Sequence, residues 1–190
     1  KKKLELVISK RPVIIITLQW KKNVTKKIID MPKNVVKSLQ ILVNKEWDCW
    51  IRFHPAHKEE FSRETLHQNW NKTTNLKINS HHIHDVSDFS LPYLLKFTNV
   101  HITNFSASII DSKIMNVPTY FWCKDKKIIN SLIQNYLKNK YINRLPGNIN
   151  KIAIVLDKHK IKKKKSLNSI NISKTEYDNF IKIIIKLKKL

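Results

Sequence analysis

Short apolar runs alternate along the chain with longer segments of helical spacing. The first run, from Val13 to Trp20, is typical of a parallel strand covered on both faces. Over residues 31–43 the apolar side chains recur with a helical period, and Pro32 lies near the start. Residues 48–53 form a second apolar run. This alternation predicts an α/β protein with a Rossmann-like, doubly wound parallel sheet.

The pattern is more polar between residues 58 and 96. It predicts a helix from Glu59 to Trp70 and a short exposed edge strand over residues 75–79. Later, residues 128–137 have helical spacing, whereas residues 151–156 fit either a strand or a buried helical turn.

Lysines crowd the end of the chain. We expect a basic surface loop over residues 158–173 and a basic helix with a broad apolar face over residues 174–190. That helix either closes the fold or lies on an acidic surface. Together, residues 1–190 are predicted to form one domain.

Residues 98–122 read as strand, hydroxyl-rich turn, helix and strand. A helix beginning near Ser108 leaves backbone N–H groups unpaired, and these can hold a phosphate. The Ser106 and Ser108 hydroxyls can add donors, and Asp111, one turn into the helix, can accept hydrogen bonds from a ribose. The alternative is ordinary capping, because the turn lacks the glycines of specific phosphate motifs.

A second candidate lies where the buried strand at residues 48–53 ends in Arg-Phe-His-Pro. Open α/β sheets bind ligands at the carboxyl edge, and side-chain alternation places Arg52 and His54 on one face. There the two side chains can share a phosphate, and the imidazole can stabilise a leaving group. The alternative is that His54 only caps the strand end.

The segment from Thr103 to Ser108 resembles the donor-site segment of GT-B glycosyltransferases, most closely the CDP-glycerol glycerophosphotransferase and capsule-polysaccharide transferase group. That group's pattern reads Thr-Asp-Tyr-Ser-Ser, then an Asp and a Pro. Three residues match: Ser106, Asp111 and Pro118. Asn104 and Phe105 depart from the pattern and remove a carboxylate and a hydroxyl. His54 and Pro55 are similar to the His-Pro that ends a strand in that group. Residues 85–96 resemble the acidic-capped helix that precedes the donor strand there.

This resemblance implies the donor-binding, C-terminal half of a GT-B transferase that moves a sugar or polyol-phosphate from a CDP- or UDP-linked donor to a cell-surface polymer. Its implied partners are the donor, a polymer acceptor and an N-terminal Rossmann-like half, since 190 residues are too few for both halves. No cofactor or metal is required. The rival hypothesis is a non-catalytic nucleotide- or anionic-lipid-binding module of the same fold, which the Asn104 and Phe105 departures leave open.

Histidines supply the remaining candidates. The run from His81 to Asp85 contains metal-ligand types, but adjacent side chains point in opposite directions, so we expect a polar loop without a metal. In the resembling group this loop lies near the donor, which implies that His84 contacts the nucleotide. His101, inside a predicted strand, is expected to be a core residue. Three others have no distinguishing pattern and are expected at the surface: His57, His67 and His159.

The net charge of +23 favours an anionic partner. Lysine supplies most of it, and no aromatic-basic platform accompanies it, so nucleic acid is an improbable partner; biased coding is the other explanation. An anionic membrane surface fits better, because a lipid-linked polymer is extended at the inner face of the membrane. Cys49 and Cys123 are too few for a disulfide scaffold and fit a cytoplasmic protein with reduced thiols.

Overall fold

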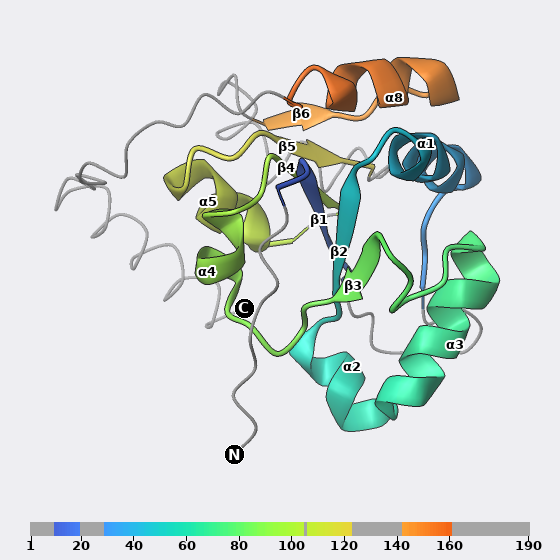
Figure 1. Cartoon of the computed structure of the whole chain (residues 1–190). Coiled ribbons are helices and arrows are strands. Elements are labelled where there is room, and N and C mark those ends of the chain that lie inside the picture. Colours follow the sequence, from blue (N-terminus) through green and yellow to red (C-terminus); the bar gives the residue numbers. More distant parts are fainter. Residues whose placement is uncertain (1–9, 20–28, 105, 123–141, 161–190) are drawn as a thin grey trace, which may run out of the picture.

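The computed structural model describes residues 10–19, 29–104, 106–122 and 142–160. Within them the backbone forms one six-stranded parallel sheet (Figure 1). Its strands are β1 (Val13–Thr17), β2 (Asp48–Arg52), β3 (Ile83–Asp85), β4 (Val100–Thr103), β5 (Thr119–Phe121) and β6 (Ile142–Arg144). The predicted α/β class and parallel sheet are confirmed.

The strand order is β3-β2-β1-β4-β5-β6. The chain starts in the middle, builds outward to β3, and returns to build the other half from β4, so the order reverses between β1 and β4. In open parallel sheets, ligands bind at the carboxyl ends of the strands beside such a reversal. Here Thr17, the last residue of β1, lies opposite Arg52 on one side and Thr103 on the other.

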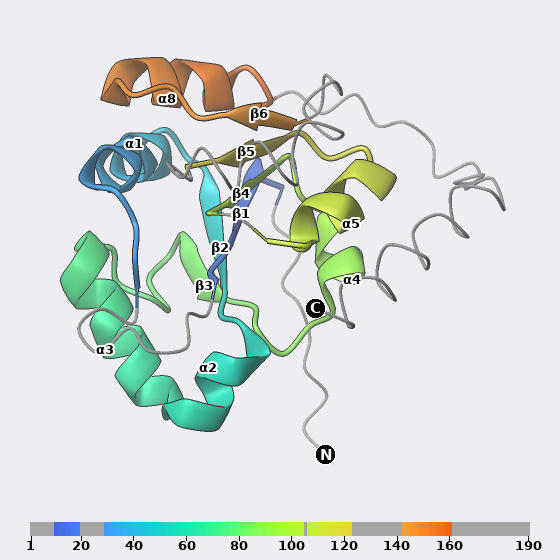
Figure 2. The ribbon, with the colours of Figure 1, turned by 180° about the vertical axis from the view of Figure 1, so that it is seen from behind.

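Helices cover both faces of the sheet (Figure 2). They are α1 (Lys33–Asn44), α2 (Pro55–Glu60), α3 (Arg63–Thr74), α4 (Leu91–Leu95), α5 (Ser108–Ile114) and α8 (Ile149–Asp157). The larger hydrophobic cluster joins one face of the sheet to α1, α3 and α8. The smaller cluster joins the other face to α4 and the chain beside α5.

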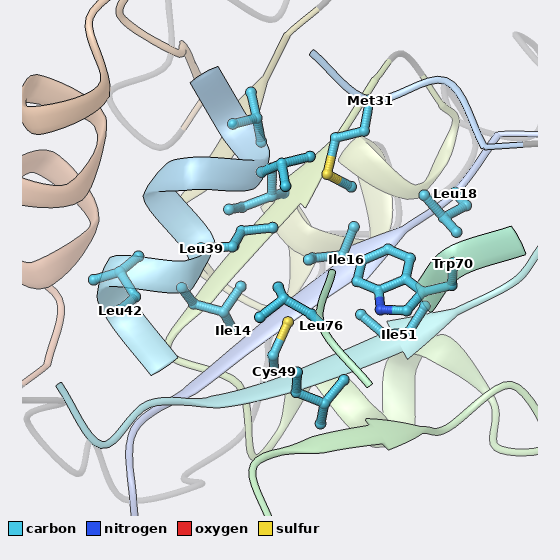
Figure 3. Close-up of a cluster of buried hydrophobic side chains, with 14 of the residues drawn as sticks. Ile14, Ile16, Leu18, Met31, Leu39, Leu42, Cys49, Ile51, Trp70 and Leu76 are labelled. Carbon is cyan, nitrogen blue, oxygen red and sulfur yellow. The ribbon is translucent and has the colours of Figure 1, made fainter. Parts of the chain in front are cut away.

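The central strand β1 is almost entirely apolar because it is buried on both sides. Ile14 and Ile16 of β1 point into the larger cluster, where Leu39 of α1 and Trp70 of α3 pack over them (Figure 3). Ile15 points the other way, against α4. Burying a side chain of this size contributes about 1.5–3 kcal/mol.

Two predictions about residues 59–79 are wrong. The expected helix from Glu59 to Trp70 is two helices, because Phe61 is extended and the Ser62 hydroxyl accepts from the Thr65 N–H, which caps α3. The expected edge strand at residues 75–79 is a turning segment, in which Asn75 and Asn79 have φ values of 57° and 64°.

Residues 81–96 also differ from expectation. The predicted polar loop at residues 81–85 contains β3, the edge strand, which pairs with β2. The helix expected within residues 85–96 is only α4, and its N-cap residue, Ser90, makes no side-chain capping bond. Residues 151–156, for which the sequence allowed a strand or a helical turn, lie in the helix α8. The helices predicted at residues 128–137 and 174–190, and most of the predicted basic loop, lie outside the described residues.

Candidate functional site

Polar side chains gather where β1, β2 and β4 end, beneath the start of α5. Thr17 shares the sheet face of Val13 and Ile15, and Arg52 shares that of Trp50, because side chains alternate along a strand. This face is the one covered by α4 and α5 (Figure 1). The candidate site is therefore the carboxyl edge of the sheet at its order reversal, on the α5 side.

Arg52 is the principal cation of this site. It is half-buried, and its Nε donates to the Phe89 carbonyl oxygen at 3.4 Å, a long hydrogen bond. Its two terminal nitrogens have no acceptor among the described residues. Burial lowers the pKa of Arg52, and the negative charge of Asp111 opposes this shift. The guanidinium thus offers a fork of unengaged donors next to a carboxylate.

Asp111, from the first turn of α5, is the matching anion. Burial raises the pKa of this carboxyl, and the positive charge of Arg52 opposes the rise. In the described part of the chain its carboxylate oxygens accept no hydrogen bond, and no ion pair within 4.0 Å joins them to Arg52. Both charged groups are partly desolvated with bonding capacity left, which a polar ligand between them would use.

His54 leaves β2 at the same edge and has a defined tautomer. Its Nδ1 accepts from the Ala56 N–H at 3.2 Å, so the neutral ring carries its proton on Nε2. Burial and then Arg52 lower the pKa of His54, with Glu59 opposing, which keeps the ring neutral at pH 7. The side chain is nevertheless exposed. His54 is therefore a helix cap and also presents an Nε2–H donor to solvent.

The start of α5 differs from expectation. The Ser106 hydroxyl accepts from the Ser108 N–H at 3.3 Å, and the next two N–H groups donate to the carbonyl oxygens of Ser106 and Ala107. Unpaired N–H groups were predicted here, but these three have local partners because the residues before the helix turn tightly. Ser106 is half-buried, and its hydroxyl can exchange the Ser108 N–H for a ligand atom. Ser108, in contrast, is only 8% exposed, and its hydroxyl bonds to Thr17.

The structure does not bring His84 to this cluster. His84 lies in β3 opposite Trp50, and burial lowers its pKa, opposed by Asp48 and reinforced by His82. Asp48 begins β2, at the amino edge of the sheet. The nucleotide contact proposed for His84 stays a prediction, and none of these neighbours belongs to the candidate site. Across the described ranges, no group of three possible metal ligands is present.

Pattern reading missed an ionic network that supports the site. The buried Asp85 carboxylate accepts from Arg63 Nε at 2.8 Å, His67 Nε2 at 2.8 Å and the Ser87 N–H at 2.9 Å. Arg63 also bonds to Asp88 at 2.7 Å. This network holds the segment that carries the Phe89 carbonyl to Arg52. The i, i+4 spacing of Arg63 and His67 on one helix was the available signal.

Three histidines expected at the surface have hydrogen-bond partners within the protein. His57 is 2% exposed, and its Nδ1 accepts from the His54 N–H. His67 binds Asp85, as described above, and His159 Nε2 lies 2.9 Å from the Tyr120 hydroxyl. The surface prediction is wrong for His57, whereas His67 and His159 are partly buried. In contrast, His101 is confirmed as a core residue, since it is fully buried and hydrogen-bonded through both ring nitrogens.

No family model and no curated protein matches this chain. Solved structures do. The UDP-GlcNAc 2-epimerase from Methanocaldococcus jannaschii, in complex with UDP-GlcNAc and UDP, has a TM-score of 0.56 at 14% identity, over 93% of this chain and 46% of the epimerase. A putative UDP-N-acetylglucosamine 2-epimerase from Listeria monocytogenes gives 0.53 at 11% identity, over 84% and 40%. The wall teichoic acid polymerase TagF gives 0.52 at 18% identity, over 80% and 36%.

These likenesses show the fold. The neighbours are GT-B proteins, so the six-stranded sheet is that of one GT-B domain, as the resemblance implied. The chain spans less than half the length of each of these neighbours.

Proposed function

We propose that this chain is the donor-binding half of a GT-B transferase, which moves a sugar or polyol-phosphate from a nucleotide-activated donor to a cell-surface polysaccharide or teichoic-acid-like polymer. The observation that carries the proposal is Arg52. It is half-buried at the carboxyl edge beside the order reversal, and its terminal nitrogens have no acceptor in the described part of the chain. A diphosphate is the bidentate, anionic group that such a fork fits.

The neighbouring residues extend this assignment. Asp111 lies close enough to Arg52 for their charges to interact, and it has free acceptor capacity for ribose hydroxyls. Ser106, one turn earlier, has a hydroxyl that can turn from the Ser108 N–H to a phosphate oxygen. The fold neighbours support a nucleotide ligand, because one of them is described as a complex with UDP-GlcNAc and UDP.

His54 is the proposed catalytic residue. Its neutral ring donates through Nε2, so it can hydrogen-bond to the diphosphate as negative charge develops on the departing nucleotide. It is not placed to remove a proton from the acceptor through Nδ1, since that nitrogen is occupied by the Ala56 N–H. A general base, if the reaction needs one, belongs to the other half, together with the polymer acceptor site.

The proposed setting is the cytoplasmic face of an anionic membrane, where lysines gain about 1 kcal/mol each near the surface. No helix in the described ranges has both the length and the apolar character of a membrane span. The rival, a nucleotide-binding module without catalysis, shares the site and differs only in turnover. No cofactor, metal or nucleic acid forms part of either proposal.

Titration calorimetry with CDP, UDP, GDP and CMP tests the proposal. One nucleoside diphosphate should bind, and CMP should bind more weakly because it lacks the second phosphate. Arg52→Gln and Asp111→Ala should each weaken binding by about 10- to 100-fold, which corresponds to roughly 1.5–3 kcal/mol for a hydrogen bond to a charged group.

Arg11→Gln is the matched control, because it removes an equal charge from the amino edge of the same sheet, where Arg11 pairs with Glu46 at 3.1 Å. It should leave the affinity unchanged. Equal affinities in folded Arg52→Gln and in the parent protein would exclude this site. Turnover of CDP-glycerol or UDP-sugars by a longer protein containing both halves then separates a transferase from a binding module.

A further inference from the structure

A closed set of buried hydrogen bonds joins α5 to the two central strands. The Thr17 hydroxyl lies 2.8 Å from His101 Nε2 and 3.1 Å from the Ser108 hydroxyl. On the other side of the imidazole, His101 Nδ1 lies 2.6 Å from the Ser112 hydroxyl, which also bonds to the Ser108 carbonyl oxygen at 3.0 Å. All four side chains are at most 8% exposed.

Counting donors fixes the direction of these bonds. The Ser112 hydroxyl has one proton and gives it to the Ser108 carbonyl oxygen, so it must accept from His101 Nδ1–H. Nε2 is then an acceptor, which takes the Thr17 proton. Thr17 in turn accepts from Ser108. This single arrangement satisfies every contact in the set.

The arrangement also changes what Ser108 can do. Its hydroxyl proton points inward to Thr17, so it has none left for a phosphate. Its buried position agrees with this, since only 8% of Ser108 is exposed. The expectation that Ser108 donates to the diphosphate is therefore not supported by its geometry, and Ser108 belongs instead to the support of the site.

His101 holds the first turn of α5 at both its ends, directly at Ser112 and through Thr17 at Ser108. Ser108 is the first residue of α5 and Ser112 the fifth, and Asp111 lies immediately before Ser112. Without these bonds α5 would be held mainly by burial of its apolar face, of which Ile109 is part, and apolar burial does not fix its rotation about its own axis. Rotation of α5 would move Asp111 relative to Arg52.

We propose that His101 is a positioning residue of the donor site: by bridging Thr17 and Ser112, it sets the orientation in which α5 presents Asp111 to the nucleotide. This inference rests on the proposed function for its ligand, but the orientation of α5 can be measured without a ligand. His101 reaches neither the solvent nor the donor, since it is fully buried.

The test compares two buried polar residues near the start of β4, Asn99 just before the strand and His101 within it, which make different contacts. His101→Leu removes the direct bond to Ser112 of α5 and the bond to Thr17, which itself contacts Ser108 of α5. Asn99→Leu is the matched control, because Asn99 is also buried but bonds to the Val13 N–H and the His159 carbonyl oxygen at the amino edge. Both variants should lower stability. Only His101→Leu should weaken binding of the nucleoside diphosphate, by about tenfold or more, and raise amide hydrogen exchange in α5.

Two further variants define the mechanism. His101→Asn keeps a donor near the Nδ1 position and should retain more affinity than His101→Leu. Adding His101→Leu to Asp111→Ala should weaken binding by no more than about twofold beyond Asp111→Ala alone, because the imidazole acts through that carboxylate. Should His101→Leu fail to fold, Thr17→Val, which removes only the hydroxyl, replaces it with the same expectations.

Several outcomes would overturn the inference. One is unchanged affinity and unchanged exchange of α5 in a folded His101→Leu protein; another is an equal loss of affinity in Asn99→Leu; a third is full additivity with Asp111→Ala. If the parent protein binds no nucleoside diphosphate, the proposed function fails, and the exchange of α5 amides still decides whether His101 orients the helix.

Discussion

The buried His101 should make the protein sensitive to mild acid. Burial, together with the positive charge of Arg52, lowers the pKa of His101 from its ordinary value of 6.5 to about 3. In the unfolded chain the ring takes up a proton below pH 6.5, whereas in the folded protein it stays neutral down to about pH 3. Between these two values acid therefore favours the unfolded state.

The size of the effect follows from the shift. Each pH unit between the two pKa values costs about 1.4 kcal/mol, so His101 alone should remove about 2 kcal/mol between pH 7.5 and pH 5. Single domains of this size have a total stability of roughly 5–15 kcal/mol, so the loss is large enough to measure. Stability contributed by the neutral ring is fully present above pH 6.5 and is lost as the pH falls.

Urea unfolding at both pH values, followed by circular dichroism, measures this loss. His101→Asn serves as the comparison because asparagine does not titrate. Other histidines with lowered pKa values, such as His57, and the oppositely shifted Asp111 contribute equally to both proteins and cancel. The parent protein should lose about 2 kcal/mol more than the variant. Parallel losses in the two proteins would refute a neutral, inaccessible His101.

Three other outcomes are expected. Asp85→Ala should lower the free energy of unfolding by about 2–4 kcal/mol in urea titrations, because it leaves Arg63 Nε, His67 Nε2 and the Ser87 N–H without their acceptor. A change below 0.5 kcal/mol would contradict the network. His54→Ala in a protein with both halves should reduce turnover by about 10²-fold, while nucleotide affinity changes only a few-fold. A lower melting temperature with normal turnover per folded molecule would show that His54 acts only as a helix cap. The chain should sediment with anionic liposomes at low salt and be released at high salt. Equal sedimentation with neutral liposomes would mean that the +23 net charge reflects biased coding rather than membrane binding.

The inner strands could be predicted from the sequence, because burial on both faces of a sheet leaves a run of apolar residues. The run from Val13 and the run from Asp48 both became central strands. β3 could not be read, since Ile83 to Asp85 is an edge strand of three residues with polar neighbours, and pairing with β2 rather than composition makes it a strand.

The candidate site was partly predictable. The strand ends that carry Arg52 and His54 follow from alternation and from the position of carboxyl edges. The inward turn of Ser108 and the bridging role of His101 do not, because they depend on the contact between α5 and two strands that are more than 80 residues apart in sequence. Likewise, α5 begins with local N–H pairing that residue types alone do not indicate.

The arginines of this chain give the last argument for the donor site. Only four basic residues are arginine: Arg11, Arg52, Arg63 and Arg144. An arginine differs from lysine chiefly in holding two acceptors at once. Arg63 does so with Asp85 and Asp88, and Arg11 contacts Glu46 and the buried Asp48.

Arg52 has the same fork but only the single long bond to Phe89 within the described residues, which is the state expected of a ligand-binding arginine before its ligand arrives. Arg52→Lys keeps the charge and removes the fork. It should therefore weaken nucleoside-diphosphate binding nearly as much as Arg52→Gln in calorimetry, by about tenfold or more, whereas Arg144→Lys at the exposed end of β6 should not. If Arg52→Lys binds as tightly as the parent protein, the site uses only the charge at this position, and the bidentate contact with the diphosphate is refuted.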